Sequence, residues 1–349
     1  MLSEKKRQHR LVLLKKWLND IAPYEGIAQI AGDASFRHYF RVTYPDKTLI
    51  AVDAPPELED SHSFVEISKV FEAKGLYVPH VLNADLSLGF MLIVDLGDEV
   101  YFRVLTEQNA DDLYLRAVHK LHIIQSCQQF QSHHFPPFSH DLLMEELDHF
   151  EKWYLETHLG LSLSKNEKKL LSDTFALLTV SALTQPQVCV HRDYHSRNLL
   201  QLPHGEVGII DFQDAVWGPV TYDLVSLVRD CYIHWPTDQV ENWVRQYYNR
   251  ALQQGVLEDA SYQQFKQWFD WMGVQRHLKA IFIFARKWHR DHNKDYLGDI
   301  PRALNYIIEV SLGYAELEEF GVFIGDRCAP LNLINQPLYD LYRNRIRFR

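Results

Sequence analysis

Three oxygen-bearing side chains between residues 188 and 214 are suited to chemistry. The stretch reads VCVHRDYHSRNLLQLPHGEVGIIDFQD and contains Asp193, Asn198 and Asp211. A carboxylate such as Asp193, in the middle of a polar loop, can orient a hydroxyl group and accept its proton. The oxygens of Asn198 and Asp211 suit a hard cation such as Mg²⁺. This combination predicts phosphoryl transfer, which needs an aligned acceptor oxygen and neutralised phosphate charge.

Two short apolar runs must position these side chains. Val188–Val190 leads into the polar loop, and Val207–Ile210 ends directly before Asp211. Polar residues gather in any surface loop, which is the alternative explanation. Fixed residue types at fixed spacing between two predicted strands favour a functional site instead.

Four further residues are expected to support this loop. His191 and Arg192 are predicted to brace it rather than to contact substrate, and His195 lies two residues past Asp193. Asp223 lies near the start of a predicted helix. It is expected either to cap that helix or to bond back to the loop.

The loop reads H-R-D-x-x-x-x-N and is followed by Asp211-Phe212, the pattern of a kinase catalytic loop and its metal-binding aspartate. Protein kinases usually carry a lysine where this chain has His195. With its H-x-D-x-H-x-x-N loop and its downstream IIDFQDAxxGPxxYDL, the chain resembles the aminoglycoside-phosphotransferase-like small-molecule kinases over about residues 25–320. The resemblance implies a bilobal protein-kinase-like fold with ATP and Mg²⁺ as cofactors.

A narrower resemblance rests on four more segments. GDASFRHYFRV (32–42), AVDAPP (51–56), DLGD (95–98) and the QRHLK and FAR runs (275–286) are similar to bacterial anomeric kinases of N-acetylmuramate and N-acetylglucosamine. These enzymes act in peptidoglycan recycling. The resemblance implies that the ATP γ-phosphate is transferred to the C1 hydroxyl of an amino sugar, with Asp193 as base.

The nucleotide phosphates are expected to meet the turn between the first two strands. Gly32, Asp33 and Ser35 belong to that turn, where backbone N–H groups can face phosphate. Arg37 follows the turn and is the predicted phosphate-binding cation. Arg41, on the second strand, is the alternative, and a surface role for either arginine remains open.

A cation is missing from its usual place. The third strand of a kinase normally carries a lysine for the α- and β-phosphates, whereas this chain has Asp53, which is expected to repel phosphate. Asp95 and Leu96 follow an apolar strand at the predicted hinge. Backbone groups there would read the adenine edge, although Asp95 could equally be a turn residue.

The acceptor pocket is less clearly marked. Arg276 and His277 lie on a long predicted helix and are the candidate substrate-binding residues. A basic residue there would suit the lactyl carboxylate of N-acetylmuramate. The alternative is a buried structural arginine paired with an acidic neighbour.

The hydrophobic pattern predicts an α+β fold with two lobes, residues 1–97 and 98–349. An N-terminal helix is expected over 4–20, followed by short strands and one amphipathic helix. The expected strands are Ile27–Ile30, Tyr39–Thr43, Thr48–Val52, Val81–Ala84 and Phe90–Val94, with the helix at Ser61–Lys74. The second lobe is predicted to be mostly helical. Its helices are expected at Asp111–Gln128, His140–His158, Lys165–Leu183, Tyr222–Ile233, Gln239–Gln253, Tyr262–His289 and Asp299–Phe320.

Composition limits the function further. The 349 residues carry a net charge of −10, which argues against a general binder of nucleic acid or anionic membranes. The four cysteines lack C-x-x-C spacing, which suits reduced thiols in a cytoplasm. No apolar run reaches the length of a signal peptide core or a membrane span. We therefore expect a cytoplasmic enzyme with a small-molecule substrate and no obligate protein partner.

Three rival functions remain. A related kinase of an aminoglycoside, choline or another amino alcohol is the nearest, and an acidic pocket would favour it. A non-catalytic nucleotide-binding scaffold is suggested only by the missing lysine, and the retained Asp193, Asn198 and Asp211 argue against it. A protein kinase is disfavoured by His195 and by the absence of A-P-E after Asp211.

Overall fold

A computed structural model describes residues 4–30, 36–127 and 135–328, which form two compact units. The first unit contains the described residues up to Val104, Cys127 and residues 197–215. The second contains 105–126, 135–196 and 216–328. This division differs from the one expected at residue 97. Residues 197–215 join the first unit because their two strands form bridges to Tyr77 and Val100.

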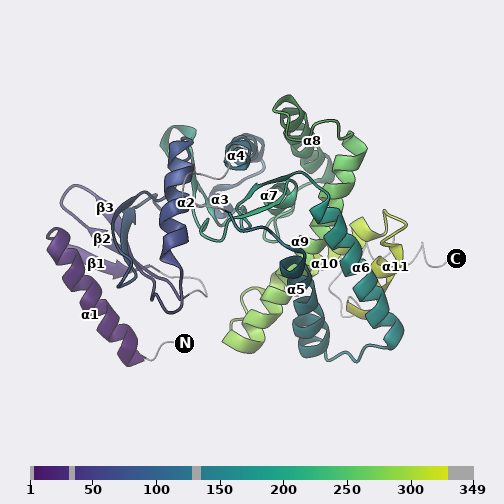
Figure 1. Ribbon diagram of the computed structural model, residues 1–349, viewed down its shortest axis with the longest axis horizontal. Helices are drawn as coiled ribbons and strands as arrows, with labels where there is room; N and C mark the ends of the chain where they lie inside the picture. Colours follow the sequence, from purple (N-terminus) through teal and green to yellow (C-terminus); the bar gives the residue numbers. More distant parts are fainter. Residues whose placement is uncertain (1–3, 31–35, 128–134, 329–349) are drawn as a thin grey trace. The chain divides into compact units, whose positions relative to one another are not determined.

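An antiparallel five-stranded sheet forms the centre of the first unit (Figure 1). Its strands lie in the order β1-β2-β3-β5-β4. They are β1 (Gly26–Gln29), β2 (His38–Thr43), β3 (Thr48–Asp53), β4 (Val81–Asp85) and β5 (Phe90–Val94). A short helix α3 (Tyr101–Val104) and the hairpin of β7 (Leu199–Gln201) and β8 (Val207–Ile209) complete the unit. All five predicted strands of the sheet are confirmed within two residues.

The N-terminal helix α1 (Glu4–Ile21) covers one face of this sheet (Figure 1). Leu14 and Leu18 are fully buried against it. Because side chains alternate along a strand, this face receives every second residue. The sheet residues packed here are Phe40, Val42, Leu49, Ala51, Phe90 and Leu92.

Asp53 belongs to the same face as Leu49 and Ala51, and its carboxylate is buried beneath α1. Arg10 Nε donates to Asp53 Oδ1 at 2.7 Å, and Arg10 Nη2 donates to the Leu88 carbonyl at 2.7 Å. The interpretation that Asp53 replaces the phosphate-binding lysine and repels phosphate is therefore wrong. Asp53 anchors α1, and Val52 is the neighbouring residue that faces the other side of the sheet.

Helix α2 (Ser61–Ala73) lies on the other side of the sheet from α1 (Figure 1). Its N-terminus is capped by Asp60, whose side chain accepts from the N–H of His62. The buried rings of Phe64 and Phe71 lie 4.9 and 5.6 Å from the ring of Phe212. The residue that follows Asp211 is thereby held against α2.

The second unit is mostly helical, with one two-stranded ladder of β6 (Gln187–Val190) and β9 (Val216–Pro219). Its long central helix α9 contributes heavily to the main buried core. The helices are α4 (Ala110–Gln125), α5 (His140–His149), α6 (Lys165–Leu183), α7 (Tyr222–Val228), α8 (Thr237–Gln253), α9 (Tyr262–Asp291), α10 (Ile300–Ser311) and α11 (Glu318–Cys328). The predicted α+β class is confirmed. No helix of the described ranges is long and apolar enough to span a membrane.

Three helix predictions were wrong in detail. The helix expected over Asp299–Phe320 is two helices, and Gly321 allows α11 to approach α10, since a Cβ there would lie 2.9 Å from Ser311 Cβ. The helix expected to reach Ile233 ends at Val228, because Asp230 instead bonds to Ser196. The helix expected over His140–His158 is π-helical from Phe150 onward.

We predict that Arg10→Ala lowers the free energy of unfolding by about 3 kcal/mol, because it leaves the Asp53 carboxylate buried without its cation. Denaturant unfolding measures this change. Lys6→Ala is the matched control, since it removes a cation of the same helix from an exposed pair with Glu57. Equal, small losses for the two variants would contradict the anchoring role of Asp53.

Candidate active site

The loop after β6 is held in a strained conformation by Asp223. Arg192 has a φ of +76°, in the left-handed region that costs energy for a residue with a side chain. The backbone N–H groups of His191 and Arg192 donate to the two carboxylate oxygens of Asp223 at 2.6 and 3.0 Å. Asp223 is fully buried at the start of α7. Asp223 was expected either to cap its helix or to bond back to the loop, and these hydrogen bonds show the second role.

The surroundings of Asp223 affect the charge of its carboxyl group in opposite ways. Burial raises the pKa of Asp223 to about 7, while the two N–H donors and the positive charge of Arg276 act in the opposite direction. Even with these bonds the carboxyl titrates close to neutral pH, and the two N–H donors favour its ionised form. Loop geometry and the charge of Asp223 are therefore coupled.

Asp193 lies in this loop with its side chain 38% exposed. Its backbone N–H donates to His191 Nδ1 at 3.3 Å, which fixes the loop on the buried imidazole. Burial raises the pKa of Asp193, but the positive charges of Lys279, His195, Arg276 and Arg192 outweigh it and hold the pKa well below its usual range. Asp193 is thus ionised at neutral pH and available to a hydroxyl group.

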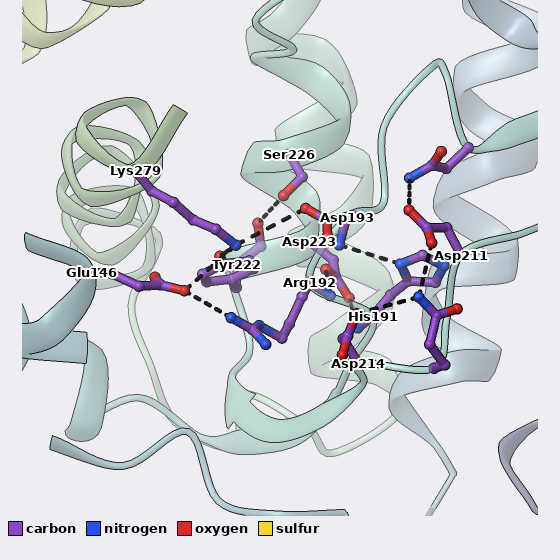
Figure 2. Close-up of polar contacts among 12 residues, drawn as sticks. Glu146, His191, Arg192, Asp193, Asp211, Asp214, Tyr222, Asp223, Ser226 and Lys279 are labelled. Atoms are coloured by element: carbon purple, nitrogen blue, oxygen red, sulfur yellow. Dashed lines mark hydrogen bonds and ion pairs between the residues drawn. The ribbon is translucent and has the colours of Figure 1, made fainter. Parts of the chain in front are cut away.

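A network of buried charges adjoins Asp193 (Figure 2). Lys279 of α9 lies 4.0 Å from Asp193 Oδ1 and 3.5 Å from Glu146 Oε1. Its Nζ donates to the hydroxyl of Tyr222 at 3.0 Å. Glu146 also pairs with Arg192 at 2.8 Å. Helices α5, α7 and α9 therefore meet the catalytic loop through one polar cluster.

Asn198 and Asp211 come together within the first unit. Asn198 Nδ2 donates to Asp211 Oδ2 at 3.3 Å, and Gln213 Nε2 donates to Asp211 Oδ1 at 2.9 Å. Asp211 has a φ of +65°, and the buried Phe212 beside it secures this conformation. A residue other than glycine keeps a left-handed backbone conformation only where the surrounding contacts stabilise it.

The donor set of Asn198 and Asp211 fits Mg²⁺. Protein sites for Mg²⁺ often supply one or two oxygen ligands and leave the remaining positions to phosphate and water. Among the described residues no group of three or more His, Cys, Asp or Glu side chains could hold a metal alone. This pair therefore suits an ion that arrives with phosphate better than a permanently bound one.

The predicted phosphate-binding residues are only partly described. Gly32, Asp33 and Ser35 lie outside the described residues. Arg37 is buried, 3.2 Å from Glu59 Oε2, and also donates to the Asp60 carbonyl at 3.2 Å. It therefore lies beside the N-terminus of α2.

Arg41, the alternative cation, is engaged by two carboxylates. Its Nε lies 2.6 Å from Asp95 Oδ2, and its Nη1 lies 2.8 Å from Asp98 Oδ2. Asp95 also accepts from Thr48 Oγ1 and from the N–H of Gly97. Burial raises the pKa of Asp95, but the hydrogen bond from Arg41, followed by those from Gly97 and Thr48, holds it below the usual range. The side chain of Asp95 thus orders the segment that contains Leu96.

The two acceptor candidates differ in their surroundings. His277 is buried, its Nε2 lies 3.1 Å from the Arg229 carbonyl, and burial lowers its pKa to about 3, so the ring is neutral. Arg276 stacks over the Tyr222 ring at 5.0 Å and is only 8% exposed. Burial lowers the pKa of Arg276, but Tyr222 and Asp193 raise it more, so the guanidinium stays charged. Its Nε is buried without a hydrogen-bond partner among the described residues.

Sequence reasoning missed Lys279 and Glu146. Lys279 belongs to the QRHLK run that was noted, three residues after Arg276, and this helical spacing places both cations over Tyr222. That spacing was the available signal. His195, which was expected to support the loop, packs edge-on against Tyr232 at 5.4 Å.

Comparison with known proteins shows which family and which relatives the chain is similar to. Residues 26–265 match the phosphotransferase enzyme family. An N-acetylmuramate/N-acetylglucosamine kinase of Pseudomonas aeruginosa is 40% identical over 89% of this chain and 90% of its own. A kinase of the same name from Pseudomonas putida is 38% identical over 91% of this chain and 96% of its own.

Solved structures show the fold. A choline kinase of Streptococcus pneumoniae superposes with a TM-score of 0.61 at 13% identity, over 86% of this chain and 99% of its own. An aminoglycoside phosphotransferase with bound ADP gives 0.56 at 12% identity, over 85% and 98%. The predicted protein-kinase-like fold, with a β-rich and a helical part, is confirmed.

We predict that Asp223→Ala lowers the free energy of unfolding by about 2–4 kcal/mol, because two buried N–H groups lose their acceptor. Phosphotransferase turnover should fall more than tenfold as the loop relaxes. Unfolding curves and kcat measure the two effects.

Ser226→Ala is the control for this prediction. Its hydroxyl is buried in the same helix but donates only to the Tyr222 carbonyl at 3.0 Å. If Asp223→Ala retained the turnover of Ser226→Ala, Asp223 would not position the loop.

Proposed function

The chain belongs to the phosphotransferase enzyme family, and we propose that it transfers the γ-phosphate of ATP to the C1 hydroxyl of N-acetylmuramate or N-acetylglucosamine. The observation that carries this proposal is the ionised Asp193 beside a cluster of buried cations, in a chain whose curated relatives are kinases of these two sugars. We infer the identity of the acceptor from the names of those relatives. We infer that the site prefers an anionic acceptor from the buried cations near Asp193.

In the proposed reaction Asp193 aligns the acceptor hydroxyl and takes its proton. The acceptor oxygen forms a bond to the γ-phosphorus while the bond from that phosphorus to the bridging oxygen breaks, and ADP leaves with the electron pair. Because the transition state is loose, the aspartate contributes mainly by orientation. A low pKa is compatible with this role, since the hydroxyl becomes acidic only as the new bond forms.

Asn198 and Asp211 are proposed to hold Mg²⁺ together with the nucleotide phosphates. The ion would neutralise the charge on the β- and γ-phosphates when bound. The chain's contribution is the fixed geometry of the two side chains, which Gln213 and the packing of Phe212 on α2 maintain. Such prior organisation reduces the cost of assembling the transition state.

Arg37 is proposed as the cation for the phosphates, in company with the backbone of Gly32, Asp33 and Ser35. Burial and Asp211 raise the pKa of Tyr39, whereas Arg37 lowers it, so Arg37 and Asp211 act on the same phenol. Arg37 is thus close to the proposed metal ligand. Asp95 and Leu96 are proposed to present backbone groups to the adenine.

Arg276 is proposed to bind an anionic group of the acceptor. A buried guanidinium is costly unless an anion completes it, and the lactyl carboxylate of N-acetylmuramate is such a group. The neutral, hydrogen-bonded His277 is proposed to orient α9 rather than to bind substrate.

The rival acceptors are disfavoured by the same cluster. Aminoglycosides and choline are cationic, whereas Asp193 is surrounded by Arg192, Arg276 and Lys279. The likeness to structures of a choline kinase and an aminoglycoside phosphotransferase reflects the fold alone. A non-catalytic scaffold would have no need for an ionised Asp193.

We expect ADP release from ATP and Mg²⁺ with N-acetylmuramate and N-acetylglucosamine, and none above background with choline or kanamycin. Asp193→Asn should reduce kcat by at least about 10²-fold, because it removes the base, while the Kd for ATP stays within about threefold. A coupled ADP assay and calorimetric titration measure these values. Turnover with choline or kanamycin alone would refute the amino-sugar assignment.

Arg276→Met should raise the KM for N-acetylmuramate by about 10- to 100-fold, the expected loss of a buried charge-assisted contact. The KM for N-acetylglucosamine, which lacks the carboxylate, should rise less. Arg286→Met, on the same helix, is the control. Equal effects of Arg276→Met on the two sugars would exclude Arg276 as the carboxylate ligand.

A further inference from the structure

Lys279, in the second unit, is a cation within ion-pair distance of Asp193. Its Nζ lies 4.0 Å from Asp193 Oδ1, and the lysine is 7% exposed. Helix α9 carries it, far along the chain from the catalytic loop (Figure 2). The Asp193 side chain is partly exposed, but the ammonium group of Lys279 is buried, so solvent screens their charge interaction less than it would screen a pair of exposed groups.

The ammonium group is held in place from two sides. It donates to the Tyr222 hydroxyl at 3.0 Å, and Glu146 lies 3.5 Å away. Burial lowers the pKa of Lys279, but Glu146, Tyr222 and Asp193 raise it more, so the group stays protonated. Lys279 is therefore a fixed positive charge at the base.

The loop itself supplies no lysine. The residue two positions past Asp193 is His195, and its ring packs against Tyr232. Arg192 is the permanent cation within the loop. Lys279 adds a second one from α9, on the side of Asp193 that faces Glu146 and Tyr222.

We propose that Lys279 is a positioning residue of the phosphoryl transfer, which holds the Asp193 carboxylate ionised and aimed at the acceptor hydroxyl. The inference rests on the proposed function and deepens it. The charged and titratable groups that face Asp193 or Lys279 come from α5, the loop, α7 and α9. They are Glu146, Arg192, His195, Tyr222, Asp223 and Arg276.

Lys279→Met is a usable test because it leaves Glu146 paired. Arg192 remains 2.8 Å from that carboxylate after the ammonium is removed. Lys266→Met is the matched control: Lys266 lies on the same helix and pairs with Asp270 at 2.6 Å, and Asp270 likewise keeps an arginine, Arg229, at 2.9 Å. The two variants lose the same charge at different distances from Asp193.

The first measurement is the titration of the Asp193 carboxyl by ¹³C NMR of aspartate-labelled protein, with Asp193→Asn identifying the signal. Lys279→Met should raise the pKa of Asp193 by about one unit or more, and Lys266→Met should not. This readout needs no acceptor, so it decides the inference even if the wild-type chain turns over neither sugar. An unchanged pKa in Lys279→Met overturns the proposal.

The second measurement is turnover with whichever sugar the wild-type chain phosphorylates. Lys279→Met should lower kcat by about 10- to 100-fold with little change in the KM for ATP, and the acid limb of kcat/KM should move to higher pH as the carboxylate protonates more readily. Lys279→Arg should recover part of kcat. A pKa that moves while kcat and its pH profile stay unchanged also overturns the proposal.

If Lys279→Met unfolds, Lys279→Gln replaces it, because it also removes the charge, keeps a polar group beside the Tyr222 hydroxyl and leaves Glu146 paired with Arg192. Thermal melting shows whether each protein is folded under the assay conditions. Folded Lys279→Gln with wild-type kcat refutes the inference, and the expected loss of kcat supports it. Failure of the proposed function appears separately, as absence of wild-type turnover with both sugars.

Discussion

The hydrogen bonds from the loop after β6 to Asp223 are the constraint on which the site depends. They fix His191 and the left-handed Arg192, and with them the direction of Asp193. The same turn sends Arg192 towards Glu146. The buried carboxylate of Asp223 thereby holds the strained loop in one conformation. Burying this polar group inside the protein costs free energy.

Charge organises the surroundings of Asp193. Glu146 lies between Arg192 and Lys279, while Arg276 and Lys279 share the face of Tyr222. The carboxylate stays ionised because these cations outweigh burial. An anionic substrate suits this balance better than a cationic one, which connects the electrostatics of the loop to the proposed amino-sugar acceptor.

Periodicity and turn residues were sufficient to predict the strands of the sheet, most helices and the two strands that flank the loop of Asp193 and Asn198. They could not show which face a strand residue takes, so Asp53 was misread as a phosphate-repelling residue when it binds Arg10. The early end of α7 depends on the tertiary bond from Ser196 to Asp230. The three-residue spacing from Arg276 to Lys279 places the two cations on one face of α9, but only the packing of that helix brings Lys279 to Asp193.

The proposed product is an amino sugar that carries phosphate on its anomeric oxygen. The most direct measurement is the ³¹P NMR spectrum of the product formed from ATP and N-acetylmuramate, with the proton coupling of the phosphorus identified. We expect a sugar phosphate whose phosphorus couples to the anomeric proton. A phosphate on another hydroxyl, or ATP recovered intact with folded protein, would contradict it.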